Sequence, residues 1–255
     1  MKVYYGSDLH LEFRKDYPKI PTDGDILLLV GDITTIVNIS IYLEFFKEIS
    51  FNFKEVYYVL GNHESYNFDF NNSLNTIRLF FIKHNINNIF ILDNDCHKLN
   101  NEYYIFGSTL WTDFKNNDPL VKYYYPKDLN DVRCIKNIDS EIIYNENQKA
   151  RKDLEEAYNF VKDKNKKLIV MTHHAPSIQS IHPMYKSSGD MNYYYVNTRL
   201  LENYCYEDDN IITHFIHGHC HTEFDYMEGS INVLCNPYGY VNENKKEYEF
   251  KCFEI

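Results

Sequence analysis

Glycine, proline and tryptophan are scarce in this sequence: 9 Gly, 7 Pro and a single Trp occur among 255 residues. No Gly/Ser-rich stretch, Pro-rich linker or internal repeat divides the chain, so we expect one domain spanning residues 1–255, a length common for a single α/β unit. Long apolar runs are also missing, and none approaches the ~20 residues of a membrane span. The first residues enter a polar motif without the apolar segment of a signal peptide. We therefore expect a soluble, cytoplasmic protein with no membrane partner.

The sequence also lacks closely paired cysteines and an excess of positive charge. None of the six cysteines forms a CxxC pair, and a chain of this length does not need disulfides to fold, so we expect reduced thiols. Lys and Arg together number 26 against 37 Asp and Glu, which gives a net charge of −11. An acidic surface repels the phosphate backbone of nucleic acids, so nucleic acid is a disfavoured partner.

Apolar runs and helical spacings alternate along the chain. The predicted strands cover residues 2–7, 25–30, 55–60, 88–92, 103–108, 167–171, 213–216, 230–234 and 248–253. The predicted helices cover residues 39–49, 74–84, 141–164 and 196–204. Strands that alternate with helices predict an α/β fold in which helices cover the sheets.

Five of the predicted strands are followed directly by polar motifs. In chain order these are Asp8-Leu9-His10, Gly31-Asp32, Gly61-Asn62-His63-Glu64, Thr172-His173-His174 and Gly218-His219-Cys220-His221. Sites in α/β sheets are built at the carboxyl ends of strands. Strands far apart in the sequence can therefore deliver these side chains to one place.

The residue types in these motifs are those of a metal site. The carboxylate of Asp32 has enough lone pairs to bridge two cations, and Asn62 offers a neutral carbonyl oxygen. His63 offers an imidazole that can be protonated near neutral pH. The D-x-H and G-D pieces are common by chance when taken alone, whereas the His219 and His221 pair after a glycine is a strong metal signal.

The order of the five motifs resembles the calcineurin-like metallophosphoesterase superfamily, and the resemblance runs from Asp8 to Tyr240. Residues 107–111, 129–133 and 172–177 also resemble a bacterial and phage-type branch that lies outside the protein phosphatases. The resemblance implies a two-sheet β-sandwich flanked by helices, in four α/β/β/α layers.

The resemblance also implies two divalent metal ions. It implies one ion bound by Asp8, His10 and His221, a second bound by Asn62, His173 and His219, and Asp32 as the bridge between them. The choice of His173 rests on aligning Thr172-His173 with the histidine at a strand end in the family, and His174 is the alternative. Histidine and asparagine ligands fit Mn, Fe, Zn, Co or Ni better than Ca or Mg, and we favour Mn.

The implied activity is hydrolysis of phosphomonoesters or small phosphodiesters. In the family's chemistry a metal-bridging hydroxide attacks phosphorus in line, and His63 faces the substrate and assists without binding metal. A metal-dependent nuclease and a non-catalytic scaffold on the same fold are the alternatives. The acidic charge argues against the first, and the complete ligand set together with His63 argues against the second.

The sequence departs from the protein Ser/Thr phosphatases at two positions. Their G-D-x-x-D-R-G motif has a second aspartate where this chain has Thr35, and Leu60 stands where they carry a basic residue. The resemblance therefore leaves the partner that orients His63 unassigned, and protein phosphatase activity is disfavoured.

Substrate choice is expected in the segments between the motifs. Cap loops around residues 113–137 and 177–196 are predicted to cover the metals. Within the first, Asn130 and Arg133 are candidates for holding a phosphate or a base, because arginine recognises phosphate through two parallel hydrogen bonds. The alternative for Arg133 is a structural ion pair with Asp131 or another carboxylate.

Overall fold

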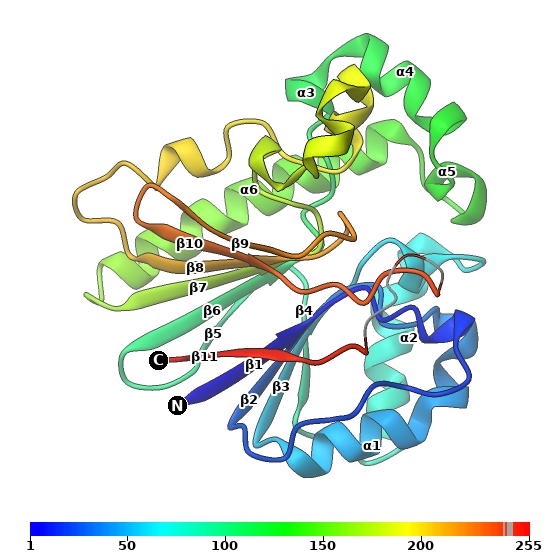
Figure 1. Cartoon of the computed structure of the whole chain (residues 1–255), viewed down its shortest axis with the longest axis vertical. Helices are drawn as coiled ribbons and strands as arrows, with labels where there is room; N and C mark the ends of the chain where they lie inside the picture. The colour runs from blue at the N-terminus through cyan, green and yellow to red at the C-terminus, as the bar shows by residue number, and fades with distance from the viewer. Residues whose placement is uncertain (242, 244–246) are drawn as a thin grey trace.

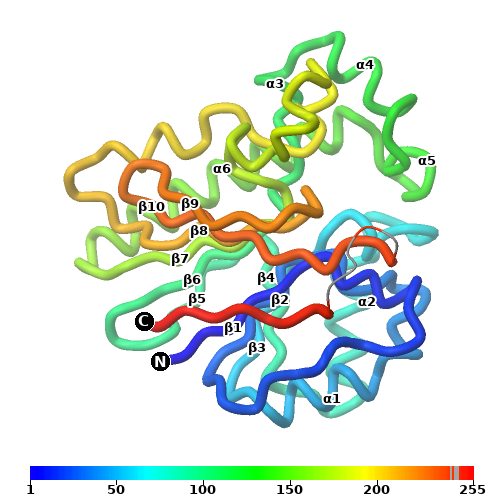
Figure 2. The backbone as a smooth tube through the Cα atoms, in the orientation of Figure 1, coloured from blue at the N-terminus to red at the C-terminus, as the bar shows by residue number. Residues whose placement is uncertain are grey.

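Two β-sheets pack face to face in the computed structural model, which describes residues 1–255 apart from 242 and 244–246 (Figure 1). The first sheet is five-stranded with the order β11-β1-β2-β3-β4, and β11 alone runs antiparallel to its neighbour. Its strands are β1 (Lys2–Gly6), β2 (Ile26–Val30), β3 (Glu55–Val59), β4 (Ile89–Leu92) and β11 (Lys251–Glu254). Figure 2 shows the two chain ends side by side, as the pairing of β1 with β11 requires.

The second sheet is six-stranded with the order β5-β6-β7-β8-β10-β9. Its four inner strands are parallel, and the two edge strands run antiparallel to them. The strands are β5 (Asp95–Lys98), β6 (Tyr103–Ser108), β7 (Lys167–Thr172), β8 (Ile212–His217), β9 (Phe224–Glu228) and β10 (Ile231–Cys235).

Each inner strand of the first sheet is buried on both faces. In β2, Leu28 packs between the two sheets, whereas Leu27 and Leu29 pack on the opposite face toward the helices. Successive side chains of a strand point to opposite faces, so a strand covered on both sides needs a continuous apolar run. This is why residues 26–30 read Ile-Leu-Leu-Leu-Val.

Helices cover the outer face of each sheet. Phe46 of α1 (Leu43–Asn52) and Ile77 of α2 (Phe70–Lys83) lie in the outer core of the first sheet. Leu154 of α6 (Ser140–Lys162) lies in that of the second. The predicted α/β/β/α layering is therefore confirmed.

Short helices occupy the two segments that the sequence predicted as cap loops. The first segment contains α3 (Phe114–Asn117), α4 (Pro119–Asp128) and α5 (Asp131–Cys134), and the second contains the 3-10 helices η4 (Ile178–Ser180) and η5 (Pro183–Tyr194). Phe114, Tyr125 and Tyr194 pack in one small core that joins the two segments. In Figure 1 they form the green and yellow body at the top of the molecule.

The remaining differences from the sequence prediction have local causes. The edge strands β5 and β9 were missed, because their exposed or half-buried residues carry no continuous apolar run. The helix predicted over 196–204 is wrong: Val196 bridges to Ala175, and only Leu201–Asn203 forms a 3-10 turn. Helix α2 begins four residues earlier than predicted, because Asp69 accepts a hydrogen bond from the Asn71 N–H and caps it.

No helix among the described residues is both long and apolar enough to cross a membrane.

Candidate metal centre

All five motifs lie at the same edge of the two sheets. Asp8 and His10 follow β1, Asp32 follows β2 and Asn62 follows β3. From the second sheet, His173 follows β7, and the His219/His221 pair follows β8. Because the parallel strands of each sheet end at one edge, the seven predicted ligands come together there.

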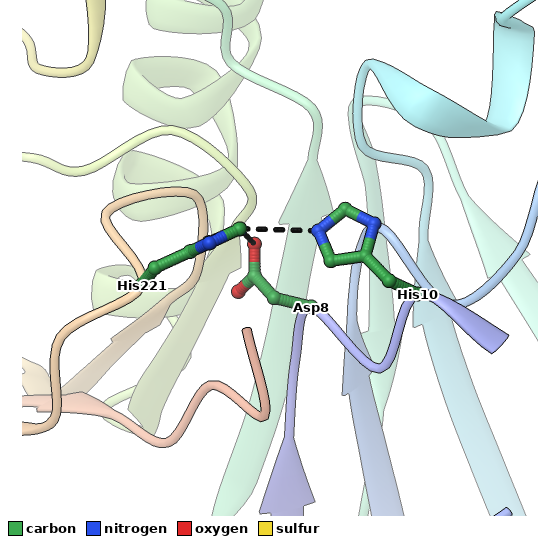
Figure 3. A group of neighbouring side chains, drawn as sticks. All are labelled: Asp8, His10 and His221. Carbon is green, nitrogen blue, oxygen red and sulfur yellow. Dashed lines mark hydrogen bonds and ion pairs between the residues drawn. The ribbon is translucent and has the colours of Figure 1, made fainter. Parts of the chain in front are cut away.

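The first group consists of Asp8, His10 and His221, whose ligand atoms all lie within 4.8 Å of one another. Figure 3 shows the three side chains pointing toward one another. His221 Nε2 lies 3.1 Å from His10 Nε2 and 3.4 Å from Asp8 Oδ1. Asp8 is fully buried and also accepts the backbone N–H of His219, which ties the loop after β1 to the loop after β8.

The second group consists of Asp32, His173 and His219, again with ligand atoms within 4.8 Å of one another. His173 Nε2 lies 3.3 Å from Asp32 Oδ2 and 3.1 Å from Asn62 Oδ1. Asp32 Oδ2 also lies 3.8 Å from His10 Nε2, so this oxygen stands between the two groups. That is the position a bridging carboxylate takes.

The spacing of these atoms fits metal ligation. With metal–nitrogen bonds of about 2.0–2.1 Å, two nitrogens on one tetrahedral ion lie about 3.3 Å apart, close to the 3.1 Å between His10 and His221. His219 Nε2 is buried without a hydrogen-bond partner among the described residues. Buried polar atoms are normally satisfied, so an orphan nitrogen in a group of nitrogen and carboxylate donors fits a divalent transition metal.

Most of the predicted ligands have an unusual backbone conformation. Five of the seven have positive φ, which costs L-residues roughly 1–2 kcal/mol each. They are Asp8 (51°), His10 (44°), Asp32 (54°), His219 (66°) and His221 (45°). Strain of this kind gathers at functional sites and persists only where the surroundings enforce it.

Two glycines let the strands approach closely at this edge. Gly31 has a φ of +82°, and a Cβ there would lie 2.3 Å from the Nδ1 atom of His173. A Cβ at Gly61 would lie 2.1 Å from Asp32 Oδ1. The glycines of the G-D and G-N-H-E motifs therefore leave space for the side chains of the predicted ligands His173 and Asp32, respectively.

The buried carboxylate of Glu64 fixes the loops after β2 and β3. It accepts hydrogen bonds from the backbone N–H groups of Asp32 (3.0 Å), Ile33 (2.7 Å) and Gly61 (2.7 Å), and from the Tyr58 hydroxyl (2.6 Å). Burial raises the pKa of Glu64 to about 7. Glu64, the fourth residue of the G-N-H-E motif, thus accepts hydrogen bonds from backbone N–H groups and is not one of the predicted metal ligands.

The charges at the site favour cations. Burial raises the pKa of Asp32, but the neighbouring histidines 173, 63 and 10 together outweigh it and hold this pKa well below its usual value. Burial lowers the pKa of His173 and His221, but their carboxylate neighbours outweigh it and raise the two values to about 9 and about 10. The carboxylates thus stabilise positive charge in the space that they share with the imidazoles.

The adjacent histidines 173 and 174 lie in different surroundings. His173 belongs to the second group, whereas His174 belongs to none of the candidate ligand groups found among the described residues. The His174 ring lies 4.1 Å from the His219 ring and 5.2 Å from Trp111, and burial lowers its pKa to about 3. The geometry therefore favours His173 as the ligand.

His63 stands at the side of the first group. Its ring stacks on Tyr66 with a centroid distance of 4.0 Å, and its Nε2 lies 3.1 Å from the Tyr240 hydroxyl. Its Nδ1 lies 3.2 Å from Oε1 of Glu12. Burial lowers the pKa of His63, but Asp32 and Glu12 outweigh it and raise the value above the usual range.

Three carboxylates outside the predicted set of site residues lie within hydrogen-bonding distance of predicted ligands. Glu12 Oε1 lies 3.3 Å from His10 Nδ1, and Glu243 Oε2 lies 2.6 Å from His221 Nδ1. Carboxylates of this kind set the tautomer and orientation of metal-bound histidines. The one available sequence signal was the spacing D-x-H-x-E, which places Glu12 two residues after His10.

The third of these carboxylates, Asp131, comes from α5, in the first of the two segments predicted as cap loops. It is fully buried and accepts hydrogen bonds from Asn62 Nδ2 (2.8 Å), from the Tyr66 hydroxyl (2.7 Å) and from the Tyr125 hydroxyl. Because the amide nitrogen of Asn62 donates a hydrogen bond to Asp131, the amide oxygen of Asn62 faces His173.

A pocket of about 1230 Å³ opens over the two groups. Residues 128–131 and several residues of 181–195 line it, together with Tyr238 and Tyr240. Asn130 is among the lining residues, and its Oδ1 accepts a hydrogen bond from Arg133 Nη2 at 2.8 Å. Arg133 thus contacts the pocket lining through Asn130, and the carboxylate of Asp131 accepts a hydrogen bond from Asn62.

Comparison with known proteins places this site in a family. Residues 1–223 match the family model described as calcineurin-like phosphoesterase. An uncharacterized protein from Acanthamoeba polyphaga mimivirus is 29% identical over 282 residues, which cover 98% of this chain and 95% of that protein.

Two solved structures illustrate the likeness of fold. The phosphopantetheinyl hydrolase of Mycobacterium tuberculosis superposes with a TM-score of 0.66 at 12% identity, covering 98% of this chain and 95% of its own. A dimetal phosphatase from Danio rerio gives a TM-score of 0.53 at 12% identity, covering 92% and 86%. At such low identity these likenesses show the fold alone.

Proposed function

We propose that this chain, which belongs to the calcineurin-like phosphoesterase family and is a metal-dependent phosphoester hydrolase, cleaves phosphomonoesters or small phosphodiesters with the help of two divalent ions. The observation that carries the proposal is the position of Asp32 Oδ2, 3.8 Å from His10 Nε2 and 3.3 Å from His173 Nε2. One carboxylate oxygen thereby joins two groups of donors.

The proposed ligands divide as the sequence predicted. Asp8, His10 and His221 would hold one ion, Asn62, His173 and His219 the other, and Asp32 both. Two ions in such a site supply an activated water and neutralise charge on the phosphate oxygens. The imidazole-rich set favours Mn, Fe, Zn, Co or Ni, with Mn the first choice.

The chain's own contribution to the reaction comes from His63. Its Nε2 faces the pocket beside Tyr240, and its raised pKa keeps a larger fraction protonated near neutral pH. A protonated His63 would donate from Nε2 to the oxygen that leaves phosphorus, a contribution of roughly 10²–10⁴-fold in rate.

The pocket supports a small substrate rather than a nucleic acid. Its lining includes the carboxylates of Asp128, Glu223, Glu243 and Glu249, and the whole chain carries a net charge of −11. A long polyanion would meet these charges, whereas one phosphate group can reach the metal ligands at the floor. Tyr195 and Tyr240 stand beside that floor and offer apolar surface to the rest of the substrate.

The test uses protein loaded with Mn and two chromogenic substrates, p-nitrophenyl phosphate and bis-p-nitrophenyl phosphate. We expect hydrolysis of at least one, and loss of both activity and bound Mn in Asp32→Ala. The matched control is Asp163→Ala, because Asp163 is exposed and lies just before β7, at the opposite sheet edge. Wild-type protein that leaves both substrates untouched, or Asp32→Ala that keeps its metal and activity, would refute the proposal.

A further inference from the structure

The carboxylate of Glu12 contacts the proposed proton donor and a proposed metal ligand at the same time. Its Oε1 lies 3.2 Å from His63 Nδ1 and 3.3 Å from His10 Nδ1. The side chain is only 3% exposed, and its other oxygen, Oε2, has no hydrogen-bond partner among the described residues. We propose that Glu12 is the positioning residue of His63, in place of the aspartate partner that this chain lacks at Thr35.

The two contacts determine where the protons of both imidazoles lie. An ionised carboxylate only accepts hydrogen bonds, so each contact requires a proton on the Nδ1 of the histidine. For His10 this leaves Nε2 free of a proton and directed at His221 Nε2, 3.1 Å away. For His63 it leaves Nε2 as the atom that gains and loses a proton.

The surroundings hold the His63 ring in this orientation. Tyr66 stacks on one face at 4.0 Å, with the planes 21° apart, and the Tyr240 hydroxyl lies 3.1 Å from Nε2. Glu12 itself lies in η1 (Leu11–Phe13), the 3-10 turn that follows His10. One short segment after β1 therefore supplies a proposed metal ligand and the residue that orients the proton donor.

The proton transfer that Glu12 supports balances as follows. A water molecule forms a new P–O bond and loses a proton to solvent, while the P–O bond to the leaving group breaks and its electron pair goes to the leaving oxygen. That oxygen takes the Nε2 proton of the His63 imidazolium. The resulting neutral imidazole keeps its proton on Nδ1, where it is hydrogen-bonded to Glu12. Solvent then returns a proton to Nε2.

A third metal ion is the competing explanation, because donor atoms of His10, Glu12 and His63 also lie within 4.8 Å of one another. Such an ion would need the Nδ1 of His10 while Nε2 of the same ring binds the first group's ion. The ring would then have to lose both protons, and neutral imidazole is the usual metal ligand. Hydrogen bonding to Glu12 needs no such deprotonation.

The first test reads the tautomers directly and does not depend on activity. Protein with ¹⁵N-labelled histidine is loaded with Zn, which is diamagnetic, and long-range ¹H–¹⁵N spectra report which nitrogen carries each proton. At a pH where His63 is neutral, we expect His10 and His63 both as Nδ1–H forms with downfield protons, assigned with His63→Asn. In Glu12→Gln both protons should move upfield. A wild-type His63 found as the Nε2–H form would overturn the proposal, as would a metal content of three ions that falls to two in Glu12→Gln.

The second test rests on the proposed function. Across aryl phosphates of rising leaving-group pKa, Glu12→Gln should lower kcat by about 10- to 100-fold for the poorest leaving group, with little change for the best one and KM nearly unchanged. At saturating metal, which offsets the lost contact between Glu12 and the proposed ligand His10, it should cost nothing further in a His63→Asn background. The control is Glu44→Gln, the same change at a side chain that is 75% exposed. A uniform loss across leaving groups would refute the role. If wild-type protein hydrolyses none of these esters, the proposed function fails, and the spectra still decide the position of Glu12.

Discussion

Asp131, the first residue of α5, offers the sharpest test of how this site is held together. It comes from α5, outside the two sheets, yet its carboxylate reaches Asn62, a proposed ligand of the second ion. Replacing Asp131 with Asn keeps the shape of the side chain and removes its charge. Replacing it with Ala removes the acceptor altogether.

The magnitude follows from the three donors that Asp131 satisfies. Each buried donor left without an acceptor costs about 1–3 kcal/mol, so the three together should cost Asp131→Ala ~3–9 kcal/mol, a large share of the ~5–15 kcal/mol typical of a domain. Asp131→Asn keeps one acceptor oxygen and loses the charge-assisted part of the bonds, about 1–2 kcal/mol.

The functional effect should fall on one ion only. Without the carboxylate, the amide of Asn62 can rotate and turn its nitrogen toward the second ion in place of its oxygen. Loss of such an outer partner costs about 10- to 100-fold in metal affinity. Calorimetric titration with Mn should show one site weakened by that factor and the other unchanged, and urea unfolding of the metal-free protein should show the stability loss.

The control is Asp128→Asn, a change of the same kind three residues away. Asp128 is exposed, lines the same pocket and bonds the Tyr194 hydroxyl rather than a proposed ligand. In Asp128→Asn, both sites should bind Mn with wild-type affinity. If Asp131→Asn binds two Mn ions as tightly as wild type, the inference that Asp131 orients Asn62 is wrong.

Three further outcomes follow from the site. His63→Asn should lower kcat by roughly 10²–10⁴-fold with the metal content unchanged, and elemental analysis showing metal loss would contradict its placement outside the ligand set. Gly61→Ala should lose metal and activity together, because the new Cβ would lie 2.1 Å from Asp32 Oδ1; wild-type Mn affinity would show that the loop shifts at no cost. Metal affinity should rise with pH up to about 9 to 10: the raised pKa values of His173 and His221, about 9 and about 10, mean that protons compete with the ion at lower pH. Competition titrations from pH 6 to 9 that give one constant affinity would contradict this.

The sheets could be predicted from the sequence because their inner strands are buried on both faces. Residues 26–30 form an unbroken apolar run followed by Gly31 and Asp32, and β2 ends within one residue of the prediction. Edge strands such as β5 (Asp95–Lys98) were missed, because their residues are half-buried or exposed and carry no continuous apolar run.

The candidate ligands were also predictable, for a related reason. A ligand must leave its strand at the sheet edge, and the residue that allows the turn is adjacent in sequence, as Gly61 is to Asn62. The short-range sequence pattern therefore indicates both where a candidate ligand lies and which chemical group it offers. It does not distinguish His173 from His174, because both follow the same strand, and only the packing shows which ring faces Asp32.

The sequence by itself determined the α/β/β/α layering, the family and the candidate metal ligands, because each depends on neighbours within a few positions. The tertiary structure decided which side chains stand behind those residues. Glu12 reaches His63 across 51 positions, Asp131 reaches Asn62 across 69, and Glu243 meets a histidine held by the β8 loop. Carboxylates occur throughout an acidic chain, and only the folded backbone selects the few that lie within hydrogen-bonding distance of a ligand.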